Sequence, residues 1–269
     1  MIAPTPWAAS LEPLYLGLAG LAAVAYAHRA RGDRPAGLRA AAFGCGLLLV
    51  VVPLDSPLET IASRYLLLAH LVQNAMIADW APPLLIIGLT PAVREAIEHR
   101  LGRAFELLTR LPVALTVWLV AWYGTHLPLP YDAALRHPAW LNLEHGILIA
   151  AGVVFWWPLI ARSGDRRSPQ ALIVYLLLGS LLSAPLSLFY IFSSTPFYGF
   201  YAERPRLWGL SPIRDQNLGG IFMNAEQSVV LFAALAYFFK RWLDQEQREP
   251  EDGSEAAARD PAGPLRWSA

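Results

Sequence analysis

The stretch AWLNLEHGILIAAGVVFWWPLIA, residues 139–161, decides the fold of this 269-residue chain. It is predominantly apolar and longer than the ~20 residues needed to cross a hydrocarbon core about 30 Å thick. A helix is predicted, because lipid cannot satisfy the hydrogen-bonding groups of an open backbone. Arg162, Arg166 and Arg167 follow directly. The pattern therefore predicts a membrane-spanning helix that ends on the cytoplasmic side.

Six more segments approach or exceed this length. They are residues 11–27, 36–54, 62–89, 111–127, 170–193 and 216–243. The whole chain is 55% hydrophobic and 16% charged, with a mean hydropathy of +0.38. This composition is typical of a membrane protein. The formal net charge is zero and the basic residues are dispersed, which excludes a nucleic-acid-binding patch.

Basic residues fall mainly in alternate links between the seven segments. The links after the first, third, fifth and seventh segments hold Arg29, Arg31, Arg34, Arg39, Arg94, Arg100, Arg103, Arg110, Arg162, Arg166, Arg167, Lys240, Arg241, Arg248, Arg259 and Arg266. The remaining ones are Arg64, Arg136, Arg204, Arg206 and Arg214. By the positive-inside rule, we expect an all-α, polytopic bundle of seven transmembrane helices, with its N-terminus outside and its C-terminus in the cytoplasm.

The domain organisation follows from these segments. Residues 1–244 are predicted to form the seven-span membrane domain, and residues 245–269 a disordered cytoplasmic tail rich in charge, Ala, Pro and Gly. Residues 91–110 predict an amphipathic helix at the cytoplasmic surface. Residues 195–214 form the longest external link, and their aromatic side chains predict a cap over the outer face. A single cysteine, Cys45, excludes an intramolecular disulfide.

Polar side chains gather in the outer third of the predicted membrane. His70 and Asn74 share one face of the third span, since residues four apart on a helix are neighbours. The other outer polar groups and the thioether are His126, Glu144, His145, Asp215, Gln216 and Met223, with Glu226 about one turn further in. Asp79 lies deeper, nearer the cytoplasm. Ionisable groups within a membrane usually face the bundle interior and find partners.

Two interpretations of these polar groups stay open. They form either a hydrogen-bond network that holds the helices together, or a metal or proton site that faces outward. Imidazole, carboxylate and thioether together suit copper or another late transition metal. Histidine with carboxylate alone also suits zinc or a proton path.

An ordered set of short motifs carries a family resemblance. The motifs are HLVQN (70–74), APPLL (81–85), WYGTHLP (122–128), YD (131–132), EH (144–145), WWP (156–158), DQNLGG (215–220) and Met223. Together they resemble the CtaG-type (caa-type) cytochrome c oxidase assembly factors of bacterial inner membranes. The resemblance implies a multi-pass inner-membrane protein that is not an enzyme. It also implies that the protein helps to assemble a haem-copper oxidase by delivering or inserting copper from the periplasmic side.

The resemblance implies a copper ion as cofactor, with cytochrome c oxidase subunits and the lipid bilayer as partners. Carried over residue by residue, the implied metal ligands are His70, His126, Glu144, His145, Asp215 and Met223. Two positions depart from the family pattern. Asn74 stands where the family often has a second histidine, and Glu226 stands where an apolar residue is expected.

Two other classes of membrane protein stay open as alternatives, and two further classes are rejected on chemical grounds. A copper transporter is the first alternative, and it requires polar positions that step through the whole membrane. An integral b-type cytochrome is the second, because His70 and His145 lie at similar depth on different spans. A retinal protein is excluded, since the only lysine, Lys240, lies at the cytoplasmic end of the last span. A hydrolase is not indicated, because no nucleophile, base and acid set emerges.

Overall fold

The computed structural model describes residues 5–30, 32, 37–161 and 168–259. Within these residues the chain is helical and contains no strand, which confirms the all-α prediction. The helices are α1 (Pro13–Ala30), α2 (Gly37–Leu54), α3 (Pro57–Arg64), α4 (Leu67–Ala75), the π-helix η1 (Met76–Trp80), α5 (Ala81–Gly88), α6 (Pro91–Leu108), α7 (Leu111–Thr125), α8 (Pro128–Arg136), α9 (Pro138–Ile160), α10 (Pro169–Phe192), α11 (Gly199–Ala202) and α12 (Pro212–Arg259).

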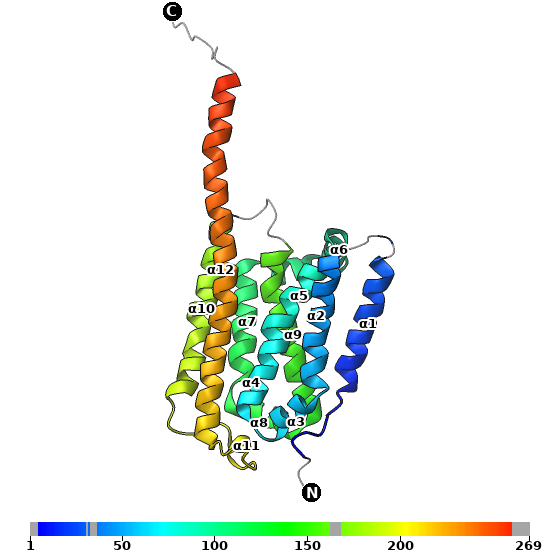
Figure 1. Ribbon diagram of the computed structural model, residues 1–269, viewed down its shortest axis with the longest axis vertical. Coiled ribbons are helices and arrows are strands. Elements are labelled where there is room, and N and C mark those ends of the chain that lie inside the picture. The colour runs from blue at the N-terminus through cyan, green and yellow to red at the C-terminus, as the bar shows by residue number, and fades with distance from the viewer. Residues whose placement is uncertain (1–4, 31, 33–36, 162–167, 260–269) are drawn as a thin grey trace, which may run out of the picture.

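The long helices run side by side in one bundle (Figure 1). They are α1, α2, the continuous rod α4–η1–α5, α7, α9, α10 and α12. The short helices α3, α8 and α11 lie at the end of the bundle where α1 begins. Helix α6 and the C-terminal part of α12 lie at the opposite end. Successive connections thus alternate between two ends, as the arginine pattern predicts, while the side of the membrane that each end faces stays a prediction.

Four helices are long and apolar enough to cross a membrane by themselves: α2, α9, α10 and the Pro212–Gln247 part of α12. A fifth candidate is formed by the rod Leu67–Gly88 together with α6, and these two parts are bent by 110° from each other. Helix α7 is apolar but has only 15 residues. The structure therefore supports a membrane protein with four or five candidate spans, and the count of seven stays a prediction. The sharp bend before α6 agrees with the predicted surface helix.

The predicted third segment, residues 62–89, is divided in the structure. Helix α3 ends at Arg64, and a new helix begins at Leu67, because Leu66 has extended dihedral angles of φ −130° and ψ 128°. A second interruption is the π-helix η1, one turn before Pro82 and Pro83. Proline has no N–H group, so carbonyl groups in the preceding turn lose their usual partners and the helix adjusts there.

The core of the α6-side half is apolar and aromatic. Phe155 packs against Trp118 and Tyr175, with ring centroids 4.5 and 4.9 Å apart. Gly152 lets α9 approach η1 closely, since a Cβ there would lie 2.1 Å from the Ala78 carbonyl oxygen. This contact fixes the depth of α9 relative to the rod that carries the histidine of α4.

Helix α12 continues past the predicted domain boundary at residue 244 and ends at Arg259. Residues 245–259 are therefore helical in the structure, where the composition predicts a disordered tail. Most of them are Glu, Gln, Arg or Ala, which favour helix. Residues 260–269 lie outside the described part of the chain, and the division into two domains stays a prediction.

Candidate functional site

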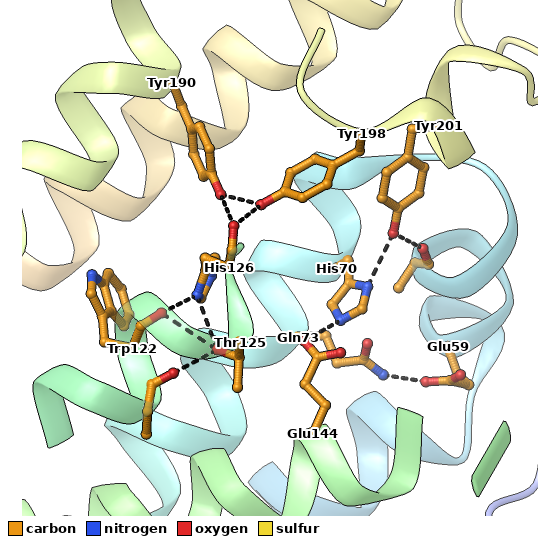
Figure 2. Close-up of polar contacts among 12 residues, drawn as sticks. Glu59, His70, Gln73, Trp122, Thr125, His126, Glu144, Tyr190, Tyr198 and Tyr201 are labelled. Atoms are coloured by element: carbon orange, nitrogen blue, oxygen red, sulfur yellow. Dashed lines mark hydrogen bonds and ion pairs between the residues drawn. The ribbon is translucent and has the colours of Figure 1, made fainter. Parts of the chain in front are cut away.

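Three helices bring four of the predicted ligands together near the end of the bundle that carries α3, α8 and α11. His70 comes from α4, Glu144 and His145 come from α9, and His126 follows α7 directly. All four are buried, with exposed fractions between 0% and 5%. Glu144 interacts electrostatically with all three imidazoles. We call these four residues the outer cluster; Figure 2 shows His70, His126 and Glu144.

The contact between His70 and Glu144 is the centre of the outer cluster. His70 Nε2 lies 3.6 Å from Glu144 Oε1, too far for a hydrogen bond. The other ring nitrogen, Nδ1, lies 3.0 Å from the Tyr201 hydroxyl, and that hydroxyl donates its proton to the Ala62 carbonyl. The Tyr201 oxygen therefore accepts from Nδ1–H. In the neutral ring, the lone pair of Nε2 then faces the carboxylate of Glu144. A proton or a metal cation between the two atoms makes this arrangement favourable.

His126 is oriented in the same way by its surroundings. Its Nδ1 lies 2.7 Å from the Trp122 carbonyl oxygen, so Nδ1 carries the proton and Nε2 is the free lone pair. The His126 carbonyl accepts a 2.8 Å hydrogen bond from Tyr198 and a 3.4 Å one from Tyr190. Backbone and tyrosine contacts thus hold this imidazole at the end of α7, in the manner of the outer partners of metal-binding histidines.

His145 and Asn74 add further polar atoms without partners. Both ring nitrogens of His145 are buried and have no hydrogen-bond partner among the described residues. The His145 ring centroid is 5.9 Å from that of His70. The two side-chain polar atoms of Asn74, one turn along α4, are likewise buried and unpartnered within the described chain. Buried polar groups in folded proteins nearly always have partners, so this concentration indicates a site for something that the chain itself does not supply.

The donor set fits a metal ion in part. Ligands about 2.0–2.2 Å from one tetrahedral ion lie about 3.3–3.6 Å apart, which matches the 3.6 Å between His70 Nε2 and Glu144 Oε1. Among the described residues, however, no three His, Cys, Asp or Glu side chains converge closely enough to hold an ion as they stand. Side-chain rotation of His145 or His126 is therefore needed to complete a coordination shell.

Asp215 and Met223, the other two predicted ligands, have different surroundings. Asp215 accepts hydrogen bonds of 2.9 Å from the backbone N–H groups of Leu67 and Leu68 through its two oxygens. It thereby caps the first turn of α4 and holds α12 against it. Met223 is 3% exposed and belongs to an apolar cluster that includes Leu71 and Trp122. The structure thus gives Asp215 a clear structural role and places Met223 in packing beside the outer cluster.

Sequence reasoning assigned no role at the site to the tyrosines that surround the outer cluster. Tyr201 sets the tautomer of His70, and the aromatic ring of Tyr131 lies 5.0 Å from that of His70. Burial raises the pKa of the Tyr201 hydroxyl well above its ordinary value, so it stays neutral. The available signal was the aromatic-rich link 195–214, whose Tyr198, Phe200 and Tyr201 are buried against the bundle. That link caps this end, as predicted, although its tyrosines point inward.

A polar pocket of about 220 Å³ opens at the same end of the bundle. Its walls include Glu12, Ser63 and the buried carboxyl group of Glu59. Glu59 accepts a hydrogen bond from Gln73, which lies one turn from His70 on α4 (Figure 2). Burial raises the pKa of Glu59, and the Gln73 hydrogen bond opposes that rise. Glu59 and Gln73 thus form a short polar connection between the pocket and the outer cluster.

Comparison with known proteins places the chain in a family. A family model described as cytochrome c oxidase caa3 assembly factor (Caa3_CtaG) matches residues 19–245. The chain belongs to this family. All members of the outer cluster, Asp215 and Met223 lie within the matched region. Searches of curated proteins and of solved structures found no match. A role in the assembly of cytochrome c oxidase follows from membership of the family.

Proposed function

We propose that this Caa3_CtaG protein binds copper as cargo in the outer cluster and passes it to subunits of a haem-copper cytochrome c oxidase. The protein acts in the bacterial inner membrane, from the periplasmic side, and catalyses no covalent step. Copper suits the donor set because neutral imidazole is a good ligand for it, and the carboxylate of Glu144 compensates its charge. Cytochrome c oxidase subunits and the lipid bilayer are its partners.

The observation that carries this proposal is the pairing of His70 Nε2 with Glu144 Oε1. The proton of His70 is engaged by Tyr201, so two electron-rich atoms face each other 3.6 Å apart inside the bundle. His126 presents a second lone pair on Nε2, because its Nδ1–H is engaged by the Trp122 carbonyl oxygen. A cation held here would satisfy atoms that have no hydrogen-bond partner among the described residues, and the Glu59 pocket supplies a polar approach.

The first experiment is deletion of the gene in cells grown with limiting copper. We expect oxidase polypeptides to be made but to be poor in copper and low in activity, with partial rescue by added copper. Complementation with His70→Gln, which keeps a polar side chain, should fail at normal protein abundance. Asp215→Asn is the comparison, since it should lower abundance. Full oxidase activity in the deletion strain under copper limitation would contradict the proposal.

Asn74→His gives a sharper test of the binding site. Asn74 lies on the His70 face of α4, is buried, and has no partner for its amide among the described residues. An imidazole there adds a ligand to the cluster, so purified Asn74→His should bind Cu(I) more tightly than the wild type in competition with a chelator. Gly44→His, on α2, is a matched control that adds a histidine away from the cluster. Equal affinity in all three proteins would argue against the site.

Orientation is tested separately with reporter fusions. A reporter after Arg162 should be active only in the cytoplasm, and one at Pro205 only in the periplasm, because basic residues favour the cytoplasmic side. The opposite result would place the outer cluster on the cytoplasmic side and remove the proposed periplasmic route.

A further inference from the structure

A second group of buried polar side chains lies deeper in the bundle, on η1 and α12. Asp79 is 5% exposed and Glu226 is 8% exposed, and their carboxyl groups interact electrostatically. Asp79 lies about 18 Å along the helix axis from Leu67, where α4 begins, and Glu226 lies about 21 Å from Pro212, where α12 begins. They are therefore at similar depth, about 13 Å further in than His70.

The partners of the two carboxyl groups differ. Glu226 Oε1 accepts a 2.6 Å hydrogen bond from the indole N–H of Trp80, and a donor at this distance favours the ionised form. Asp79 Oδ2 is buried and has no hydrogen-bond partner within the described chain. One carboxyl group is therefore stabilised as an anion by a donor, whereas its neighbour has an unsatisfied oxygen.

The π-helix explains how Asp79 reaches this position. Five residues of α-helix turn through about 500°, which would leave Asp79 about 140° away from the face of Asn74. In η1 the Ala81 N–H bonds to the Met76 carbonyl, five residues back, so each residue turns less and Asp79 returns toward that face. A π-helical turn is rare and is often found at functional sites.

The described residues around Asp79 offer it no positive charge. Helix η1 contacts α2, α4, α5 and α9, and Trp80 reaches α12. The ionisable side chains that these elements direct into the bundle are His70 on α4, Glu144 and His145 on α9, and Glu226 on α12. On α2, Arg39 is half-buried and Cys45 is exposed. Arg39 donates to the Leu89 carbonyl, and the histidines and Glu144 belong to the outer cluster. Glu226 is the charged neighbour that acts on Asp79 among the described residues.

We propose that Asp79 and Glu226 form an inner proton-binding pair, in which the two carboxyl groups hold one proton between them. Two adjacent carboxylates in an apolar bundle cannot both be ionised without a compensating cation. The proton resides on Asp79, whose oxygen lacks a donor, while Glu226 stays ionised with Trp80. The pair can then accept a cation only by releasing its proton.

The proposal goes beyond copper delivery and does not depend on it, so it is tested on metal-free, full-length protein. Infrared difference spectroscopy detects a protonated carboxyl group by its C=O stretch. The wild type at neutral pH should show a carboxylic acid band that disappears in Asp79→Asn. The band should shift in Glu226→Gln and in Trp80→Phe, because both variants change the partner of the proton. Glu59→Gln, a buried acid of the outer pocket, is the matched control and should leave this band in place.

Two results would overturn the proposal. An unchanged band in all three variants would show that Asp79 and Glu226 are both ionised. Loss of separate bands in Asp79→Asn and in Glu226→Gln would show that each carboxyl group holds its own proton. If Asp79→Asn fails to fold, Glu226→Gln and Trp80→Phe still decide, since both leave Asp79 in place.

Discussion

The two halves of the bundle are built on different principles. Around Phe155, Trp157 and Tyr175 the side chains are apolar or aromatic, and Tyr175 donates its hydroxyl proton to the Phe155 carbonyl at 3.0 Å. Around His70 and His145 the side chains are polar and equally buried, but many of their atoms have no partner within the described chain. The side chains of the two regions are equally buried. The buried polar atoms of the outer cluster, however, lack hydrogen-bond partners far more often among the described residues.

The difference separates stability from function. Close packing of apolar side chains lowers the free energy of the folded bundle, so the aromatic half should be sensitive to any change of volume. A buried polar atom without a partner raises that free energy. The outer cluster therefore weakens the fold unless water or a ligand satisfies these atoms.

The largest effect on stability is expected for Phe155→Ala. This change removes a ring that is 1% exposed and packed against three other aromatic rings. The free energy of unfolding should fall by about 3–5 kcal/mol. Thermal or denaturant unfolding in detergent measures it, with Phe192→Ala, an exposed ring at the end of α10, as control. Equal losses for the two variants would mean that the aromatic half is not the stabilising region.

Gly152→Ala should have the next largest effect and lower the free energy of unfolding by about 1–3 kcal/mol. The new methyl group meets the backbone of η1 and forces α9 away. Gly124→Ala on α7 is its control, since a Cβ there has nothing within 4 Å. The same unfolding assay compares the two. A stable Gly152→Ala variant would contradict the close contact of α9 with Ala78.

Glu59 predicts a smaller, pH-dependent effect. Burial raises its pKa in the folded protein, so folding favours the protonated carboxyl group. Its contribution to stability is present below the ordinary pKa of glutamate and is lost as pH rises through the raised value. Unfolding measured from pH 4 upward should show this loss in the wild type and less of it in Glu59→Gln. If the wild type and Glu59→Gln have identical pH profiles of stability, Glu59 is not the group responsible for the pH dependence.

The smallest change in stability is expected for His145→Leu. Both ring nitrogens lack partners among the described residues, so an apolar side chain of similar size leaves no donor or acceptor unsatisfied. The free energy of unfolding should change by less than about 1 kcal/mol, while copper-dependent maturation of the oxidase should be lost. A loss of stability of about 1–3 kcal/mol with normal maturation would favour the interpretation of a structural network.

Much of the fold could be predicted because each helix depends on the composition of one contiguous segment of the sequence. Apolar segments of sufficient length predict helices, and the alternation of arginines agrees with the placement of connections at opposite ends of the bundle. The π-helix before Pro82 has a local cause in the two prolines, whereas the break at Leu66 was not predicted, since it depends on a contact with a distant element. Asp215 begins α4 from a position 147 to 148 residues further along the chain.

The sequence by itself determined that the chain is helical and apolar, and it named the polar residues that share a depth. Depth follows from the position of a residue within its own segment, because each helical residue adds a fixed rise. Only the tertiary structure decided which of those residues meet. Packing sets the rotation of each helix about its axis. This rotation brings together His70, His126, Glu144 and His145. It also lets Asp215 bind the backbone of α4 and brings Glu226 close enough to act electrostatically on Asp79.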